Sequence, residues 1–144
     1  MSGLTAAVST ALGMTMLTAT PASSVTQIAH KCEGSTIVRC ANVEMPSTGV
    51  FNAHARVSSS SVAYKVMVTY VELQYYSSGS WRTLREEFPY PVYEIGQDVA
   101  RTDTYACGSS ARKLVRARVK VAWDNGSTVT RDELVTESAY ICPR

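Results

Sequence analysis

His30 and His54 are the only histidines of the chain and the side chains best suited to act as a general base near neutral pH. A catalytic serine would need one of them, and the G-x-S-x-G turn that exposes such a serine is absent from the sequence. His30 lies at the edge of the expected folded part. His54 is out of phase with Ala53 and Ala55 on an expected strand, so we expect it on the surface. The sequence therefore predicts no catalytic residue and a protein that is not an enzyme.

The acidic residues do not predict a catalytic pair or a metal site either. Glu86 and Glu87 are neighbours, so on a strand they point to opposite faces and cannot serve one site together. The remaining acids are scattered, and the spacings of zinc and calcium sites are absent. The segment 124–126, Asp-Asn-Gly, is explained by a tight turn. We therefore expect no metal site and no cofactor.

The four cysteines point to structural cross-links. They are Cys32, Cys40, Cys107 and Cys142, an even number, and no C-x-x-C pair occurs among them. An exported chain with this pattern favours two disulfides over redox or zinc chemistry. Of the three connectivities, we favour Cys32–Cys40 because the pair is local, which leaves Cys107 for Cys142.

The N-terminal segment predicts export from the cell. Residues 1–30 contain no charged side chain, and an apolar stretch from Leu4 to Ala19 is followed by Thr-Pro-Ala-Ser-Ser. This pattern is typical of a secretion signal over residues 1–24, cleaved near Ala22, although no basic residue opens it. The alternative is an arm that stays attached. The apolar stretch is shorter than the roughly 20 residues of a membrane span, so we expect a secreted protein with no membrane contact.

Composition limits the remaining part to one domain. The whole chain has 144 residues, 45% hydrophobic and 18% charged, with a net charge of +2. It is too apolar for a disordered protein and too weakly charged for a nucleic-acid binder. We therefore expect a single folded domain over residues 25–144 and no nucleic-acid partner.

Alternation of apolar and polar residues predicts strands throughout that domain. The clearest strand covers residues 113–123, followed by the 124–126 turn and a partner strand over 127–136. A second hairpin joins 62–76 and 81–88 through a turn over 77–80. Shorter strands are expected over 36–43, 50–57, 99–107 and 138–142.

About seven strands at hairpin spacing indicate an all-β fold. We expect an antiparallel β-sandwich of the immunoglobulin-like kind, stapled by the two disulfides; a small barrel is the alternative. In its general pattern the chain resembles small exported β-sandwich proteins of bacteria, but no family motif is matched residue by residue.

The first surface of interest is a basic strand face. Arg116, Arg118 and Lys120 alternate with the apolar residues of the 113–123 strand, so all three point to one side. Such a row would suit a cell-surface glycan, another anionic polymer or an acidic patch on a partner protein. The simpler interpretation is a solvated face whose charges pair with Asp132, Glu133 or Glu137 across the hairpin.

The second surface is the segment after the 81–88 strand. Pro89 and Pro91 fix an extended backbone and prevent regular pairing, so Tyr90 and Tyr93 are expected in a rigid loop. A rigid aromatic loop loses little entropy when it binds. The simpler interpretation is a crossover loop whose tyrosines cover the core.

Together these observations predict a secreted, non-enzymatic interaction module, such as an adaptor or accessory subunit of an extracellular or toxin complex. Its expected partner is another secreted protein. One alternative is an inhibitor of an extracellular protease, with Arg39 in the Cys32–Cys40 loop as the specificity residue. Another is a glycan-binding, lectin-like domain that uses aromatics near turns, namely Trp81, Tyr75, Tyr76 and Tyr90.

Overall fold

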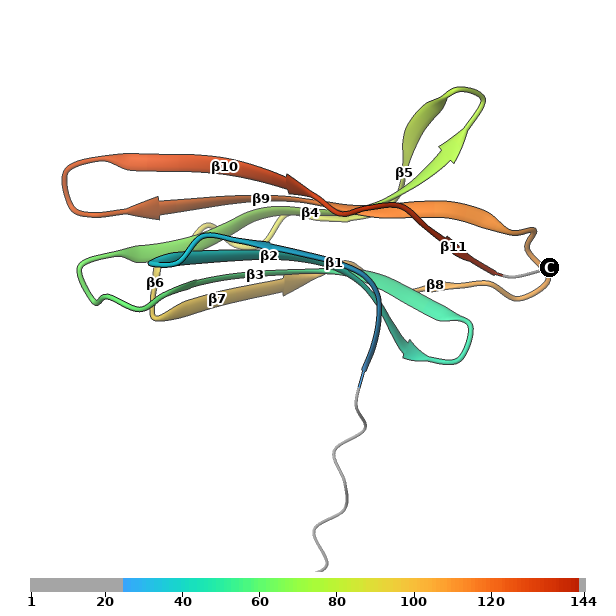
Figure 1. The fold of residues 1–144 in the computed structure, drawn as a ribbon, viewed down its shortest axis with the longest axis horizontal. Coiled ribbons are helices and arrows are strands. Elements are labelled where there is room, and N and C mark those ends of the chain that lie inside the picture. The colour runs from blue at the N-terminus through green and yellow to red at the C-terminus, as the bar shows by residue number, and fades with distance from the viewer. Residues whose placement is uncertain (1–24, 143–144) are drawn as a thin grey trace, which may run out of the picture.

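The computed structural model describes residues 25–142, which form two antiparallel β-sheets packed face to face (Figure 1). The strands of sheet A are β1 (Thr26–Glu33), β2 (Ile37–Ser47), β3 (Val50–Ser59), β7 (Gln97–Arg101) and β8 (Tyr105–Ala106). The strands of sheet B are β4 (Lys65–Ser77), β5 (Ser80–Glu87), β6 (Glu94–Ile95), β9 (Lys113–Asp124), β10 (Val129–Val135) and β11 (Ala139–Ile141). The predicted signal over residues 1–24 lies outside the described residues.

The order of the strands confirms the predicted sandwich. Sheet A runs β1-β2-β3-β7 and sheet B runs β10-β9-β4-β5. Apart from β1, this order matches the A-B-E and G-F-C-C′ strands of an immunoglobulin-like fold. Within the described part, seven strands have seven or more residues, and the shorter ones extend the edges of the two sheets. No helix within residues 25–142 has the length and apolarity needed to cross a membrane.

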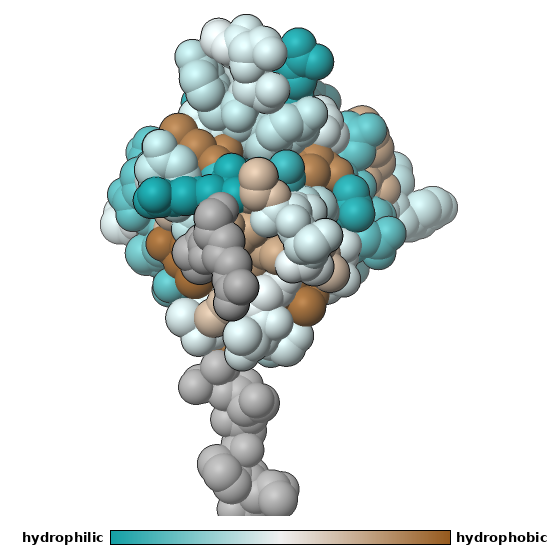
Figure 2. Space-filling model, turned by 90° about the vertical axis from the view of Figure 1, so that its right-hand side faces the viewer, coloured by the Kyte–Doolittle hydropathy of each residue, from teal (hydrophilic) through white to brown (hydrophobic). Residues whose placement is uncertain are grey.

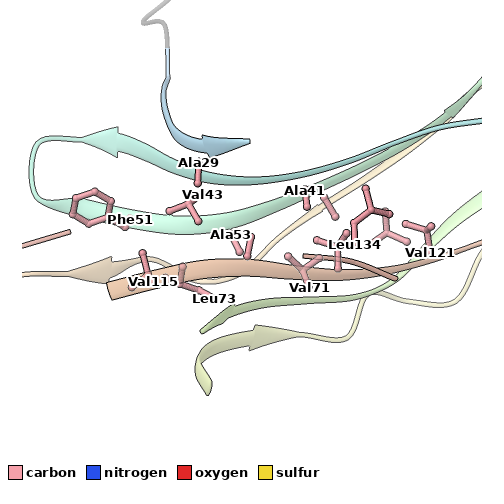
Figure 3. Packing of buried hydrophobic residues seen from close by; sticks show 14 of the residues in the cluster. Ala29, Ala41, Val43, Phe51, Ala53, Val71, Leu73, Val115, Val121 and Leu134 are labelled. Atoms are coloured by element: carbon pink, nitrogen blue, oxygen red, sulfur yellow. The ribbon is translucent and has the colours of Figure 1, made fainter. Parts of the chain in front are cut away.

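The core lies between the sheets, where alternate residues of the long strands β2, β3, β4 and β9 point inward. Val43 and Ala53 from sheet A face Leu73 and Val115 from sheet B, as Figure 3 shows. The four side chains are fully buried. The period-two alternation seen in the sequence therefore separates an apolar inner face from a polar outer face on each sheet.

The two predicted hairpins of sheet B are confirmed, with small shifts at their ends. β9 pairs with β10 and β4 pairs with β5. In the β9–β10 turn, Gly126 has a positive φ of 87°, and its N–H donates to Asp124 Oδ1 at 2.7 Å. β4 begins at Lys65, later than expected, because residues 61–64 form a turn that leaves Val62 exposed.

The expected single strand over residues 99–107 is wrong, because the chain breaks at Thr102. β7 ends at Arg101 and β8 begins at Tyr105, yet both pair with β3. The buried Thr102 accepts a hydrogen bond from the Ala53 N–H through Oγ1, and its own N–H donates to the Ala53 carbonyl. The Thr102 hydroxyl thus replaces a backbone carbonyl as the acceptor for the Ala53 N–H at the point where β7 ends.

The same hydrogen-bond pattern around a buried threonine occurs in sheet B. Thr136 separates β10 from β11, and both strands pair with β9. Its Oγ1 accepts from the Ala117 N–H at 3.0 Å, and its N–H donates to the Ala117 carbonyl at 3.0 Å. Each sheet therefore has a central strand bordered by two short strands that meet at a buried threonine.

Both predicted disulfides are present. Cys32–Cys40 joins β1 to β2 and makes a hairpin of the segment expected as a loop. Cys107–Cys142 joins the residue after β8 in sheet A to the residue after β11 in sheet B. One bond therefore staples an edge strand to its neighbour, and the other holds the two sheets together at one end.

Candidate binding surfaces

The basic row of β9 lies on the outer face of sheet B, as predicted. Arg116, Arg118 and Lys120 stand directly across from three side chains of β4. Those partners are Gln74, Glu72 and Tyr70, in the same order. The three basic groups therefore face an amide, a carboxylate and a phenol, respectively.

Arg118 is compensated by two carboxylates. Its guanidinium lies 2.9 Å from Glu133 on β10 and 3.5 Å from Glu72 on β4. The hydrogen bond from Arg118 holds the pKa of Glu133 below its ordinary value. Glu72 is only 2% exposed and also accepts hydrogen bonds from Gln74 and Thr83. Arg118 therefore compensates the buried Glu72. Its pair with Glu133 agrees with the interpretation of the row as a solvated face paired across the hairpin.

The other two expected acidic partners, Asp132 and Glu137, do not pair with the basic row. Asp132 forms its ion pair with Arg39 of β2, at 2.8 Å. Glu137 forms no ion pair with any residue in the range 25–142. Of the three acids expected to neutralise the row, only Glu133 does so.

Arg116 is held by neutral groups. Its Nε donates to Gln74 Oε1 at 2.7 Å, and its guanidinium carbon lies 4.1 Å from the centre of the Trp81 ring. Trp81 meets Tyr76 edge-on at 5.3 Å, at the tip of the β4–β5 hairpin that projects from the sheet in Figure 1. Arg116 thereby contacts both strands of this projecting hairpin, through Gln74 on β4 and Trp81 on β5.

Lys120 lies beside an aromatic pair. Its Nζ is 5.5 Å from the centre of the Tyr70 ring, and Phe88 lies 4.8 Å from the same ring. The Tyr70 hydroxyl donates to Glu86 at 2.9 Å. Burial and then this hydrogen bond raise the pKa of Tyr70, so the hydroxyl stays protonated and acts as a donor.

These side chains border a hollow of about 350 Å³ on the outer face of sheet B. Its lining consists of Thr69, Tyr70, Phe88, Arg118 and Lys120. A second hollow of about 330 Å³ shares Thr69 and Lys120 with the first and extends toward β10. We refer to the first hollow and the segment Phe88–Tyr93 together as the Phe88 surface.

The proline-tyrosine segment starts at this hollow. Phe88 remains 68% exposed and Tyr90 is 85% exposed, whereas Tyr93 is half-buried. The Val92 N–H donates to the Tyr90 carbonyl at 2.9 Å, which closes a three-residue turn around Pro91. The two surfaces that the sequence indicated separately are therefore one continuous region, joined where Phe88 packs on Tyr70.

The end of the sandwich seen in Figure 2 has a different character. Hydrophobic residues on this face appear as separate spots among hydrophilic ones. Apolar residues scattered in this way are ordinary for a water-facing surface, whereas exposed aromatic side chains gathered in one segment often mark a contact site.

A polar row crosses the outer face of sheet A, and sequence analysis missed it. His30 on β1, Asn42 on β2, His54 on β3 and Arg101 on β7 are direct cross-strand neighbours in that order. The register of β2 against β3 shifts by one residue between Glu44 and Ser47, so counting from the turn at residues 48–49 pairs Asn42 with Ala55 and does not find its neighbour His54. The row brings both histidines of the chain together.

His54 lies on the predicted face but is not a solvated side chain. Only 12% of its side chain is exposed, and its Nδ1 lies 2.6 Å from Glu44 Oε1. Burial pushes the pKa of Glu44 up, but His54 and Arg101 more than offset this, so the pKa lies below its ordinary value. Glu44 is therefore ionised, His54 Nδ1–H is the donor, and the buried Nε2 has no partner among the described residues.

The geometry expected for a protease inhibitor is absent from the β1–β2 hairpin. Arg39 lies inside β2 with its side chain 16% exposed, ion-paired to Glu33 and Asp132. Its guanidinium also lies 5.4 Å from the Trp123 ring. A specificity residue needs an exposed convex loop, whereas Arg39 lies within a strand, so the expected placement of Arg39 is wrong.

The aromatics expected to form a sugar platform do not share one face. Tyr75 packs against the core, whereas Tyr76 and Trp81 lie at the hairpin tip on the outer side.

Within residues 25–142, no three His, Cys, Asp or Glu side chains are grouped in a way that would hold a metal ion.

No protein-family model matches the chain, and no curated protein matches it either.

Proposed function

We propose that this protein is a secreted, non-enzymatic binding module that contacts another extracellular protein through the Phe88 surface. The observation that carries the proposal is the packing of Phe88 on Tyr70 beside Lys120. It joins an exposed aromatic segment to a cationic hollow in one region. Two disulfides in a small all-β domain fit an extracellular location.

The composition of this region favours a protein partner. Aromatic side chains are enriched at the centres of protein interfaces, where they account for much of the binding energy. Covering one large apolar side chain contributes about 1.5–3 kcal/mol. Phe88 and Tyr90 are both largely exposed, so a partner that covers them removes two such side chains from water.

The backbone of the segment also favours binding. Pro89 and Pro91 restrict φ, and the turn from Tyr90 to Val92 is closed by a hydrogen bond. Phe88 is already packed on Tyr70, so its ring position is set before a partner arrives. Little conformational entropy remains to be lost at this site on association.

A site-specific photocross-linker at position 90 of the secreted protein tests the proposal. We expect it to capture one defined protein from culture medium, and the same cross-linker at Val62 to capture none of it. Val62 is a matched control because both positions are 85% exposed and the two lie in different loops.

The captured protein is then purified and its affinity measured directly. We expect Phe88→Ala and Tyr90→Ala each to weaken binding about tenfold or more, a cost of about 1.4 kcal/mol. Val62→Ala should leave the affinity unchanged. Equal affinities for all three variants would overturn the assignment of this surface.

An anionic polymer is a second candidate, because the ammonium group of Lys120 forms no ion pair with any residue of the described range. The ammonium group instead makes a cation–π contact with the Tyr70 ring. Retention on an anionic glycopolymer that falls with salt and is lost in Lys120→Glu would favour this function. Retention that is unaffected by Lys120→Glu would exclude it for this surface.

A further inference from the structure

A small hollow lies on the outer face of sheet A, on the side of the sandwich opposite to the Phe88 surface. Its volume is about 110 Å³. Its lining comes from three neighbouring strands and consists of Gln27, His30, Cys32, Cys40, Asn42, His54 and Arg56. It is therefore polar, and three of its side chains are basic.

The two imidazoles are oriented by acceptors. His54 Nδ1–H donates to the Glu44 carboxylate at 2.6 Å, and His30 Nδ1 lies 2.8 Å from Asn42 Oδ1, which is also an acceptor. The Nε2 atom of each ring is thus left for another partner. For His54 this atom is buried and has no partner within residues 25–142, which is costly unless a bound group supplies one.

Arg56 has similar unused capacity. Its guanidinium makes one described contact, with Cys40 Sγ at 3.8 Å, and no carboxylate of residues 25–142 lies within ion-pair distance. Arg101 and Arg118, in contrast, both have acidic partners. The one carboxylate beside the hollow, Glu44, is already shared between His54 and Arg101.

We propose that this hollow binds an oxyanion, the carboxylate, sulfate or phosphate group of an acidic ligand. Arg56 provides a permanent positive charge with paired N–H donors, which suit an oxyanion. His54 and His30 add an Nε2–H donor each when protonated. The guanidinium makes the hollow unsuited to a metal cation, although two imidazoles face it.

The site takes up its ligand more strongly at acidic pH. Histidine changes charge between about pH 5 and 8, and protonation converts each Nε2 from an acceptor into a charged donor. The charged groups around His54 are Glu44 on β2, Arg56 on its own strand, Arg101 on β7 and His30 on β1. Among these neighbours Glu44 is the one acidic group, and the positive charges of Arg56 and Arg101 are offset when an anion binds.

Sulfate is the probe for the test, because its charge does not change over this pH range. Amide chemical shifts of the full folded protein are followed by NMR during a sulfate titration at about pH 5.5 and about pH 7.5. We expect saturable shifts centred on β1–β3 and affinity about tenfold higher at the lower pH. Acetate and phosphate titrations at the lower pH then show which oxyanion geometry is preferred.

Three variants decide the assignment. Arg56→Gln should weaken sulfate binding about tenfold, Arg56→Lys should retain part of it, and Arg82→Gln should leave it unchanged. Arg82 is a matched control because it is an exposed strand arginine on the opposite sheet. The amide spectrum itself shows whether each variant is folded.

Shifts that do not saturate, or that spread over both sheets, would overturn the proposal. The same holds if Arg56→Gln and Arg82→Gln bind sulfate equally well. Loss of binding in His54→Gln together with loss of the pH dependence would support the role of the imidazole.

Discussion

His54 Nδ1 lies 2.6 Å from Glu44 Oε1, on the outer face of a sheet where alternation alone predicts solvated side chains. The opposite sheet has an equivalent arrangement, with Glu72 buried under Arg118. Each sheet therefore packs apolar residues on its inner face and one buried, partnered carboxylate on its outer face. The outer faces contribute to stability and are not only solvent contacts.

Replacing Glu44 by Gln should lower the free energy of unfolding at neutral pH by about 1–3 kcal/mol, since it removes a charged acceptor from His54 and Arg101. The pKa of Glu44 is lowered on folding, so its ionised form stabilises the protein above the ordinary value of 4.5. This contribution is lost as the pH falls through the lower, folded pKa.

Urea unfolding at a series of pH values checks both effects. We expect the wild type to lose more stability than Glu44→Gln on acidification below about pH 4.5. Glu94→Gln, at an exposed position on β6, is the control and should follow the wild type. Parallel curves for wild type and Glu44→Gln would contradict the role of this carboxylate.

Charge reversal on β9 should have very different costs at two neighbouring positions. Arg118→Glu should destabilise the fold by about 3 kcal/mol, because Glu72 then loses its cation while buried. Lys120→Glu should cost less than about 0.5 kcal/mol, because Lys120 is exposed. Thermal unfolding of both variants checks this, and similar melting temperatures would show that Arg118 does not compensate Glu72.

Removing the two disulfides singly should destabilise the protein unequally. Chain-entropy arguments give about 2.6 kcal/mol for the short Cys32–Cys40 loop and about 3.8 kcal/mol for the longer Cys107–Cys142 loop. The sequence separations are 8 and 35 residues. Paired Cys→Ala variants compared in urea should therefore rank in this order, and the reverse order would show that loop length does not dominate.

Thr136→Val should lower the free energy of unfolding by about 1–3 kcal/mol, because the buried Ala117 N–H loses its acceptor, Oγ1. The two side chains have nearly the same shape, so the change isolates the hydroxyl. Thr130→Val on β10 is the control, since Thr130 is exposed. Chemical denaturation distinguishes them, and equal stabilities would mean that the hydroxyl contributes nothing.

Sequence patterns predicted the long strands because their information is local. Residues 115–121 alternate without interruption, and Asp-Asn-Gly follows at 124–126, so both β9 and its turn are readable residue by residue. Cysteine spacing gave both disulfides for a similar reason, since one pair is local and the other follows by elimination.

Features that depend on pairing across strands were not readable in this way. The segment 26–33 has few buried residues, so β1 shows little alternation although it pairs along its length with β2. The break at Thr102 follows from hydrogen bonds to Ala53, which is 49 residues away in sequence. The contact of Phe88 with Tyr70 likewise depends on how the chain leaves β5 and passes over β4.

The positions of the two disulfides determine what becomes of a proteolytically cut molecule. Cys107 lies before the β8–β9 connection and Cys142 after it, so a cut within residues 108–112 leaves two fragments that are still covalently joined. A cut in the β1–β2 turn, at residues 34–36, has the same result through Cys32 and Cys40. A molecule nicked at either place therefore keeps both fragments covalently linked and migrates as one species until a reductant separates them.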